Sequence, residues 1–363
     1  MKKLVLICAP VTSRSGYGAH ARDLVTSFLN HNKYDIKIMD VNWGECPRNA
    51  LNPKNKNDKR ILDCILPEPV QLEKQPDVYI DIRIPNEFQT HGKFNIGITA
   101  GIETTAVSAK WIEGCNKMDL IIVPSEHSKQ GFVSSIYDKL QNMPDGSQQK
   151  VGDFRLQKPM EVLFEGADEE IYKPFANQKK QPALVLKTNG ATYSIMDKEE
   201  CLQKINSIKD NFPKDWKLPN VYLLHGDLSD VEMNYLYNHP KIKSMVSLTH
   251  GEGFGRPLLE ATMTGLPIIA TSWSGHTDFL PEEKTIMIPG ELKQVPKSQV
   301  WKDILIEESQ WFEASENHTH NALKYSYENI NQLQTKASNL MKENRDKFTL
   351  NKMTEKLDEI MES

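Results

Sequence analysis

A chain of 363 residues, 39% hydrophobic and 26% charged, exceeds the ~250–300 residues at which a single core stops growing, so two domains are expected. Its net charge of −5 argues against a surface built wholesale for nucleic acid or anionic membrane. The five cysteines are odd in number and lack a C-x-x-C pair, which indicates reduced thiols in a cytosolic protein.

The chain opens on MKKLVLICAP, an apolar run that ends at Pro10 after about eight residues and is too short for most signal peptides. We therefore expect a buried first strand rather than a signal sequence. No stretch approaches the ~20 apolar residues of a membrane span, so no transmembrane segment is expected.

Short β-branched runs then alternate with helical patterns. Strands are predicted at residues 4–9, 34–41, 77–82, 94–100, 120–124, 161–166, 184–188, 221–226, 244–248, 266–271 and 285–290. Helical periodicity lies between them, as at residues 19–31 and 106–117. Continuous apolar strands separated by helices are typical of parallel sheets covered on both faces. The pattern predicts two doubly wound, Rossmann-like α/β domains, residues 1–174 and 175–345.

Three segments depart from this alternation. Residues 44–60 and 141–158 are polar and rich in Asn, Pro and Gly, so we expect mobile loops there. From about Trp301 onward the chain is polar with helical periodicity, and it ends in a helix expected at about residues 346–363.

The predicted strand at 244–248 leads into THGEGFGRPLLEATM. Glu252 stands in a glycine-bracketed turn, and Glu260 follows it in the next helix. Glycines let a backbone approach a ligand closely, and a helix N-terminus offers unpaired N–H groups to a phosphate. Carboxylates beside such a site accept hydrogen bonds from hydroxyls, so the segment suits a nucleotide sugar. On spacing alone, a solvated turn with Glu260 in a surface ion pair fits equally well.

The run EGFGRPLLEATMTGLPIIAT resembles the E-x7-E signature of retaining glycosyltransferase family 4, whose members have the GT-B fold. Residues 94–132, EVLFEGADEEIYKP at the domain junction, and residues 221–248 extend the resemblance over most of the chain. It implies two Rossmann-like domains facing each other across a cleft, with the C-terminal helix packed back on the first domain. It also implies a UDP- or GDP-sugar donor and no cofactor.

The resemblance implies that Glu252 is catalytic and holds hydroxyls of the transferred sugar, while Glu260 accepts from the nucleotide ribose. N–H groups of Phe254 and Gly255 would face the sugar and the phosphate. Arg256 stands where the family commonly has an apolar residue, and we expect it at the donor phosphates or the acceptor. The donor-binding run comprises Gly253, Phe254, Gly255, Arg256, Leu258 and Glu260.

Two lysines are candidates for the donor diphosphate. Lys187 ends the predicted strand at 184–188, where the family usually has arginine, and it is also expected to be catalytic. Lysine is a point charge without the planar fork of arginine, so a bidentate grip is lost. Lys198 is the second candidate, with a solvated lysine at a helix start as its alternative.

The first domain contributes candidates at two strand ends. Gly16 and Gly18 follow the first strand, where the family places a small-residue loop facing the donor phosphates; a plain turn is the alternative. Glu103 follows the strand at 94–100 and is expected to be catalytic by orienting an acceptor hydroxyl. A role for His20 in the cleft is left open, and Ser125 is expected to cap a helix.

The expected activity is metal-independent sugar transfer, with retention, to the hydroxyl of a glycan, lipid, protein or modified nucleic-acid base. A nucleotide-sugar epimerase of the same fold and a non-catalytic sugar-nucleotide-binding protein are the alternatives. Segment 44–60 suits a phosphate-bearing acceptor, a lipid or nucleic acid, unless it is simply a solvated loop. Its cations are Arg48, Lys54, Lys56, Lys59 and Arg60.

Overall fold

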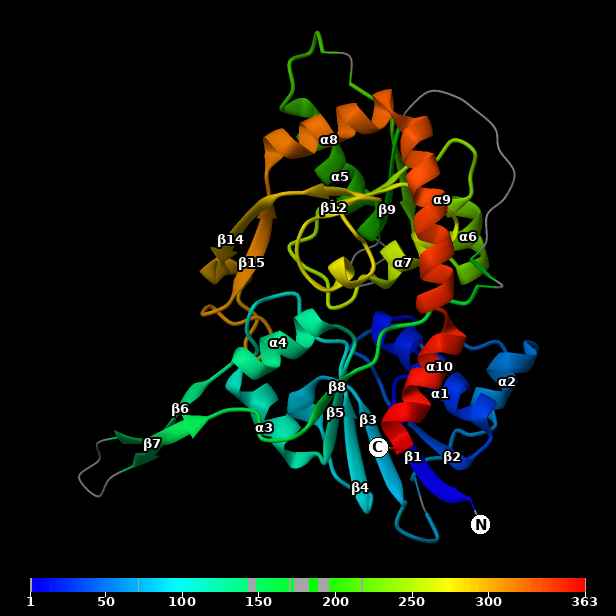
Figure 1. Cartoon of the computed structure of the whole chain (residues 1–363), viewed down its shortest axis with the longest axis vertical. Coiled ribbons are helices and arrows are strands. Elements are labelled where there is room, and N and C mark those ends of the chain that lie inside the picture. Colours follow the sequence, from blue (N-terminus) through cyan, green and yellow to red (C-terminus); the bar gives the residue numbers. More distant parts are fainter. Residues whose placement is uncertain are drawn as a thin grey trace.

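The computed structural model describes residues 2–70, 72–142, 148–169, 171–172, 183–188, 196–216 and 218–362. The described chain forms two α/β halves, one above the other in Figure 1. We call the half that contains the first 169 residues the N-terminal domain and the half that begins at residue 183 the C-terminal domain. The boundary predicted between residues 174 and 175 lies outside the described residues.

The N-terminal domain is built on one parallel sheet of six strands in the order β2-β1-β3-β4-β5-β8. The strands are β1 (Lys3–Ala9), β2 (Tyr34–Asp40), β3 (Val78–Ile82), β4 (Phe94–Ile98), β5 (Leu120–Val123) and β8 (Met160–Val162). The helices are α1 (Gly16–His31), α2 (Lys56–Leu62), α3 (Ala109–Lys117) and α4 (Glu126–Ser134). The predicted doubly wound α/β fold is confirmed here.

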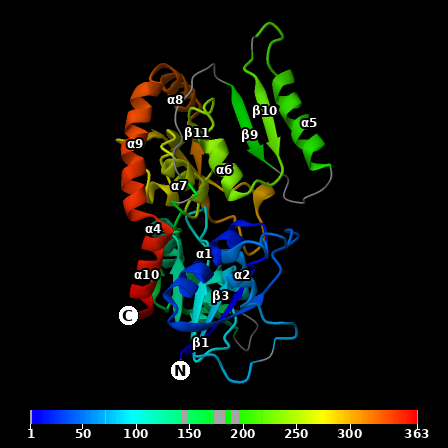
Figure 2. The same ribbon diagram turned by 90° about the vertical axis from the view of Figure 1, so that its right-hand side faces the viewer.

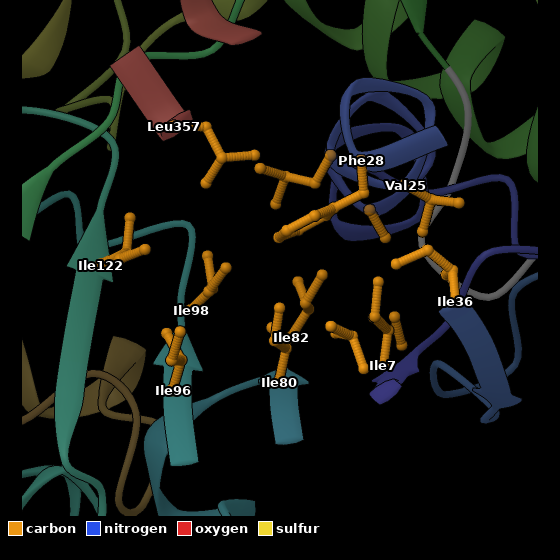
Figure 3. Packing of buried hydrophobic residues seen from close by; sticks show 14 of the residues in the cluster. Ile7, Val25, Phe28, Ile36, Ile80, Ile82, Ile96, Ile98, Ile122 and Leu357 are labelled. Carbon is orange, nitrogen blue, oxygen red and sulfur yellow. The ribbon is translucent and has the colours of Figure 1, made fainter. Parts of the chain in front are cut away.

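Helices cover both faces of this sheet, which explains why its central strands are largely apolar and buried. Alternate residues of a strand point to opposite faces, and Ile7 of β1 accordingly belongs to the cluster under α1. Figure 3 shows Ile7, Ile80 and Ile98 directed toward Phe28 of α1. Trp111 of α3 packs in a second cluster on the other side.

The two segments predicted as loops contain regular structure. Residues 56–60 belong to α2, which begins after Asn55 because the Asn55 side chain accepts from two backbone N–H groups. Much of residues 141–158 belongs to an antiparallel hairpin of β6 (Tyr137–Asn142) and β7 (Gln148–Phe154) that projects from the domain in Figure 1. The loop prediction was wrong here because polar composition does not exclude the strands of an exposed hairpin.

The C-terminal domain divides its described strands among three small sheets. The parallel pair β10-β9, the parallel sheet β11-β12-β13 and the antiparallel pair β14-β15 are separate. Figure 2 shows β9 and β10 with α5 standing to one side of β11. The strands are β9 (Leu184–Thr188), β10 (Val221–His225), β11 (Met245–Ser247), β12 (Ile268–Thr271), β13 (Ile286–Ile288), β14 (Gly290–Gln294) and β15 (Gln310–Ala314). The helices are α5 (Asp197–Asp210), α6 (Asp230–Tyr237), α7 (Arg256–Met263), α8 (Glu316–Glu328) and α9 (Ile330–Lys347).

The tail becomes helical later than predicted. Strand β15 occupies residues that follow Trp301, and α8 begins only after Ser315, whose side chain accepts from the N–H of His318. The predicted helical periodicity from residue 301 was therefore wrong for its first part. Among the described helices, none is long and apolar enough to cross a bilayer.

The chain returns to the N-terminal domain at its end. Helix α10 (Leu350–Glu362) begins at Leu350 rather than near residue 346, because the preceding backbone pairs with Ala167. Figure 1 shows α10 beside α1. Lys33 forms an ion pair of 2.8 Å with Asp358, and Leu357 is buried in the cluster under α1. Helix α10 thus completes the core of the N-terminal domain.

Leu357→Ala should lower the free energy of unfolding by about 2–5 kcal/mol, because it leaves a cavity at a side chain only 1% exposed. Urea denaturation measures this. The matched control on the same helix is Glu359→Ala, at an exposed position, with an expected change within about 0.5 kcal/mol. Equal losses in both variants would contradict the packing of α10.

Candidate active site

The glycine-rich loop 251–255 joins β11 to α7. Gly255 has φ 91°, a left-handed conformation that favours glycine, and it immediately precedes the first residue of α7. Pro257 occupies the first turn, where its missing N–H breaks no helical hydrogen bond. Leu258 is buried and anchors α7 in the core of the C-terminal domain. The local sequence therefore dictates a sharp turn into a helix, as predicted.

This loop lies against the N-terminal domain. A Cβ atom on Gly251 would lie 2.1 Å from the carbonyl oxygen of Glu103, and one on Gly253 would lie 2.3 Å from that of Ala100. Ser125 donates a 2.6 Å hydrogen bond to the carbonyl of Gly253 and also caps α4, as predicted. The glycines thus permit close approach of backbone to backbone between the two domains.

Glu252 and Glu103 are brought together by this contact. Burial raises the pKa of Glu252 to about 7, and the nearby charges of Glu103 and Glu165 add to the effect. Desolvation by the surrounding chain also raises the pKa of Glu103, although the residue keeps an exposed surface. The backbone N–H of Glu252 already donates to Ser274 Oγ at 2.9 Å. The carboxyl group of Glu252 is hydrogen-bonded to the side chain of Thr249, which opposes the rise in its pKa.

Glu260 lies on α7 behind the loop and is engaged by two side chains. Arg256 Nε donates to Glu260 Oε1 at 2.9 Å, and the Tyr172 hydroxyl also hydrogen-bonds the carboxylate. Burial raises the pKa of Glu260 to about 7 against the opposing charge of Arg256. Glu260 is thus held in place rather than solvated, which excludes the surface ion pair considered from spacing.

Arg256 reaches across to the other domain. Its Nη1 lies 2.6 Å from Asp23 Oδ2 on α1. Burial raises the pKa of Asp23, while the charge of Arg256 opposes the shift. The guanidinium expected at the donor phosphates or the acceptor is therefore occupied by two carboxylates.

His20 and Glu165 form a second buried pair nearby. His20 Nδ1 lies 3.8 Å from Glu165 Oε1, beyond hydrogen-bond distance. Burial lowers the pKa of His20 to about 4 and raises that of Glu165 to about 7. Both groups are therefore predominantly uncharged in mildly acidic solution between these values.

The remaining predicted residues lie in different surroundings. Lys187 donates a 2.7 Å hydrogen bond to the carbonyl of Gly226, and Lys198 is exposed in the first turn of α5. Gly16 is exposed with open space around it, whereas a Cβ on Gly18 would lie 2.4 Å from the carbonyl oxygen of Ser13. Packing therefore requires glycine at position 18, whereas no neighbouring atom restricts the side chain at position 16.

Segment 44–60 is largely occupied with its own neighbours. Arg48 pairs with Asp40 at 2.6 Å, and Lys59 pairs with Asp63 at 2.7 Å. Arg60 donates to the side chain of a residue on α1. Three of the five cations predicted to face an acceptor thus have partners within the N-terminal domain.

Several residues at the domain contact were missed from the sequence. Asp23 carries no local signal, because its partner is more than 200 positions away. Glu165 stands in the quoted junction, but its burial is a tertiary property. His127 packs edge-on against Trp273 with ring centroids 4.7 Å apart, and burial lowers its pKa to about 4.

No family model and no curated protein matches this chain. Solved structures match it over almost its full length. Sucrose-phosphate synthase from Thermosynechococcus elongatus has a TM-score of 0.65 at 10% identity and covers 100% of this chain and 98% of its own. The chain has the GT-B fold.

Two further structures have the same GT-B architecture. Anabaena HepE in complex with UDP-glucose has a TM-score of 0.60 at 12% identity, with 99% of both chains covered. A glycosyltransferase from Rickettsia africae has a TM-score of 0.58 at 13% identity and covers 99% of this chain and 97% of its own. At these identities the GT-B likeness is one of fold.

Gly253→Ala should separate the two domains, because the added methyl group collides with a backbone carbonyl rather than with a mobile side chain. We expect a larger radius of gyration by small-angle X-ray scattering, with each domain still folded by circular dichroism. Gly16→Ala, at an open position, is the matched control and should leave the radius unchanged. An unchanged radius in Gly253→Ala would contradict the observed contact.

Glu165→Gln should stabilise the protein more as the pH rises. Because burial raises its pKa to about 7, Glu165 binds a proton more tightly in the folded than in the unfolded chain. The wild type therefore loses stability from about pH 4.5 to about pH 7, and the glutamine variant does not lose this contribution. Melting temperatures of both proteins across this range measure the difference. The exposed position Glu355 provides the control variant Glu355→Gln. A difference in melting temperature between Glu165→Gln and the wild type that stays constant with pH would contradict the burial of Glu165.

Proposed function

We propose that this protein is a retaining glycosyltransferase that moves a sugar from a nucleotide-sugar donor to a hydroxyl acceptor. The observation that carries the proposal is the meeting of Glu252 and Glu103, one from each domain, where the glycine-rich loop touches the end of β4. In a GT-B fold, this is the end of the parallel strands at which open α/β sheets bind their ligands.

The donor would lie on the C-terminal domain. Glu252 would accept hydrogen bonds from hydroxyls of the transferred sugar, and Glu260 would accept from the ribose. The N–H groups of Phe254 and Gly255 would face the sugar and its phosphate. The UDP-glucose bound in Anabaena HepE supports a uridine nucleotide as the first donor to test, with a GDP-sugar second.

The diphosphate would be bound by cations and by the loop after β1. Lys187 has a neutral carbonyl as its partner and is the stronger cation candidate, followed by the exposed Lys198. Gly16, with open space around it, would allow a phosphate to approach the start of α1. Leu258 would support the donor from beneath the loop.

The reaction would proceed on the donor face that carries the leaving group. The bond between the anomeric carbon and the diphosphate oxygen breaks, and a bond to the acceptor oxygen forms. A diphosphate oxygen takes the acceptor proton, so neither a metal ion nor a cofactor is invoked. The protein's residues then act by positioning the reactants and by stabilising charge. Glu103 would orient the acceptor hydroxyl.

The acceptor is expected to be a glycan, lipid, protein or modified nucleic-acid base with a free hydroxyl. Because Arg48, Lys59 and Arg60 have partners in their own domain, segment 44–60 offers less positive charge to a phosphate-bearing acceptor than its composition suggests. A hydroxyl on an uncharged glycan or protein is therefore the first acceptor class to test.

Thermal-shift measurements with UDP, GDP, ADP and their glucose or mannose conjugates should identify the donor, because a ligand that binds only the folded state raises the melting temperature. Glu252→Ala should then reduce transfer or donor hydrolysis by about 100-fold or more, since a group that contacts the reacting sugar is lost. Glu283→Ala, at an exposed position, is the control.

Unchanged turnover in Glu252→Ala would refute the proposed role. Formation of a sugar isomer from the donor without an acceptor would identify an epimerase instead. A melting shift with no turnover under any acceptor would identify a non-catalytic sugar-nucleotide-binding protein.

A further inference from the structure

A chain of two ion pairs crosses from one domain to the other through Arg256. Arg256 Nε donates to Glu260 Oε1 at 2.9 Å, and Arg256 Nη1 lies 2.6 Å from Asp23 Oδ2. Glu260 and Arg256 share helix α7, one turn apart, whereas Asp23 belongs to α1 of the N-terminal domain.

All three side chains are withdrawn from solvent. Their exposed fractions are 21% for Asp23, 15% for Arg256 and 10% for Glu260. Charges in such surroundings are costly to leave unpaired, so the loss of one partner affects the groups that remain. Arg256 Nε makes a hydrogen bond to Glu260, whereas Nη1 meets Asp23 as an ion pair without an aligned hydrogen bond.

The two carboxylates paired with Arg256 belong to elements that have different roles in the proposed reaction. Glu260 is the carboxylate assigned to the donor ribose. Gly16 belongs to the loop assigned to the donor phosphates, and Asp23 lies about two helical turns further along α1. A rigid guanidinium between them therefore couples two parts of one donor site that come from separate domains.

We propose that Asp23 is a positioning residue for the donor, acting through Arg256 to orient the carboxylate of Glu260. The negative charge of Asp23 attracts the Nη1 end of the guanidinium, and Nε is then directed at Glu260. The N-terminal domain thereby sets the conformation of a donor-binding group on the C-terminal domain. The inference rests on the proposed function, in which Glu260 binds the ribose.

A second ion pair between the same domains provides a matched control. Lys110 of α3 lies 2.6 Å from Asp303, and the two side chains are 55% and 29% exposed. This pair also joins the domains, but neither of its members contacts Arg256 or Glu260. If Asp23 only held the domains together, loss of either pair would affect the donor in the same way.

The experiment measures nucleotide affinity by calorimetry, using the nucleoside diphosphate, among UDP, GDP and ADP, that gives the largest thermal shift. Asp23→Asn keeps the shape of the side chain and removes its charge, and we expect the Kd to rise about tenfold. Lys110→Met should leave the Kd within about twofold. In an Arg256→Met background, Asp23→Asn should have no further effect, because the link is already broken.

A Kd of Asp23→Asn within twofold of the wild type would overturn the proposal, as would an equal rise in Lys110→Met or full additivity with Arg256→Met. If Asp23→Asn does not fold, Arg256→Lys answers the same question, because it keeps the positive charge and loses the guanidinium group. An unchanged Kd in Arg256→Lys would then overturn the proposal. Glu260→Gln distinguishes the assignment of Glu260 to the ribose from the positioning role of Asp23. If Glu260→Gln leaves the Kd unchanged, the ribose assignment fails, whereas a weakened Glu260→Gln beside an unaffected Asp23→Asn refutes the positioning role alone.

Discussion

The close approach of two backbones, at Gly251 to Glu103 and at Gly253 to Ala100, is the constraint on which the rest of the site depends. The two backbones lie so close that a Cβ atom on either glycine would collide with a carbonyl oxygen of the other domain. Glu252 is partly buried at this contact, whereas Glu103 keeps an exposed surface. Desolvation raises the pKa of Glu252 to about 7 and also raises that of Glu103. Glycine at these positions thus determines the geometry of the contact between the domains.

Burial of several carboxyl groups near the contact between the domains has a chemical consequence. Glu165, Glu252 and Glu260 each have a pKa raised to about 7, so near neutral pH the interior holds a mixture of acids and carboxylates. A partly protonated cluster both accepts from and donates to the hydroxyls of a sugar. It also repels an unshielded phosphate less than three full charges would. The burial that favours uncharged carboxyl groups is therefore compatible with a ligand that carries hydroxyls and phosphates together.

The sequence predicted what local chemistry determines. Strand positions in the N-terminal domain follow from β-branched runs, and the turn at Gly255 follows from Gly and Pro spacing, so both could be predicted. The hairpin β6-β7 could not, because its strands are polar and exposed. The ion pair between Asp23 and Arg256 could not either, since it depends on how two domains meet. Glycines at 251 and 253 were predicted to admit a ligand, while the structure shows them admitting the backbone of the other domain.

The partners of the cations decide which of them is available to a diphosphate. Arg256 is bound by two carboxylates, so recruiting it would leave Asp23 and Glu260 buried without a counter-charge, which costs several kcal/mol. Lys187 gives up only a neutral carbonyl, and a charged hydrogen bond to that group contributes roughly 1.5–3 kcal/mol. A diphosphate offers Lys187 a stronger partner than the one it loses. In the proposed site, Arg256 would therefore act as an internal counter-charge for Glu260, and Lys187 would be the cation that exchanges its partner for the donor.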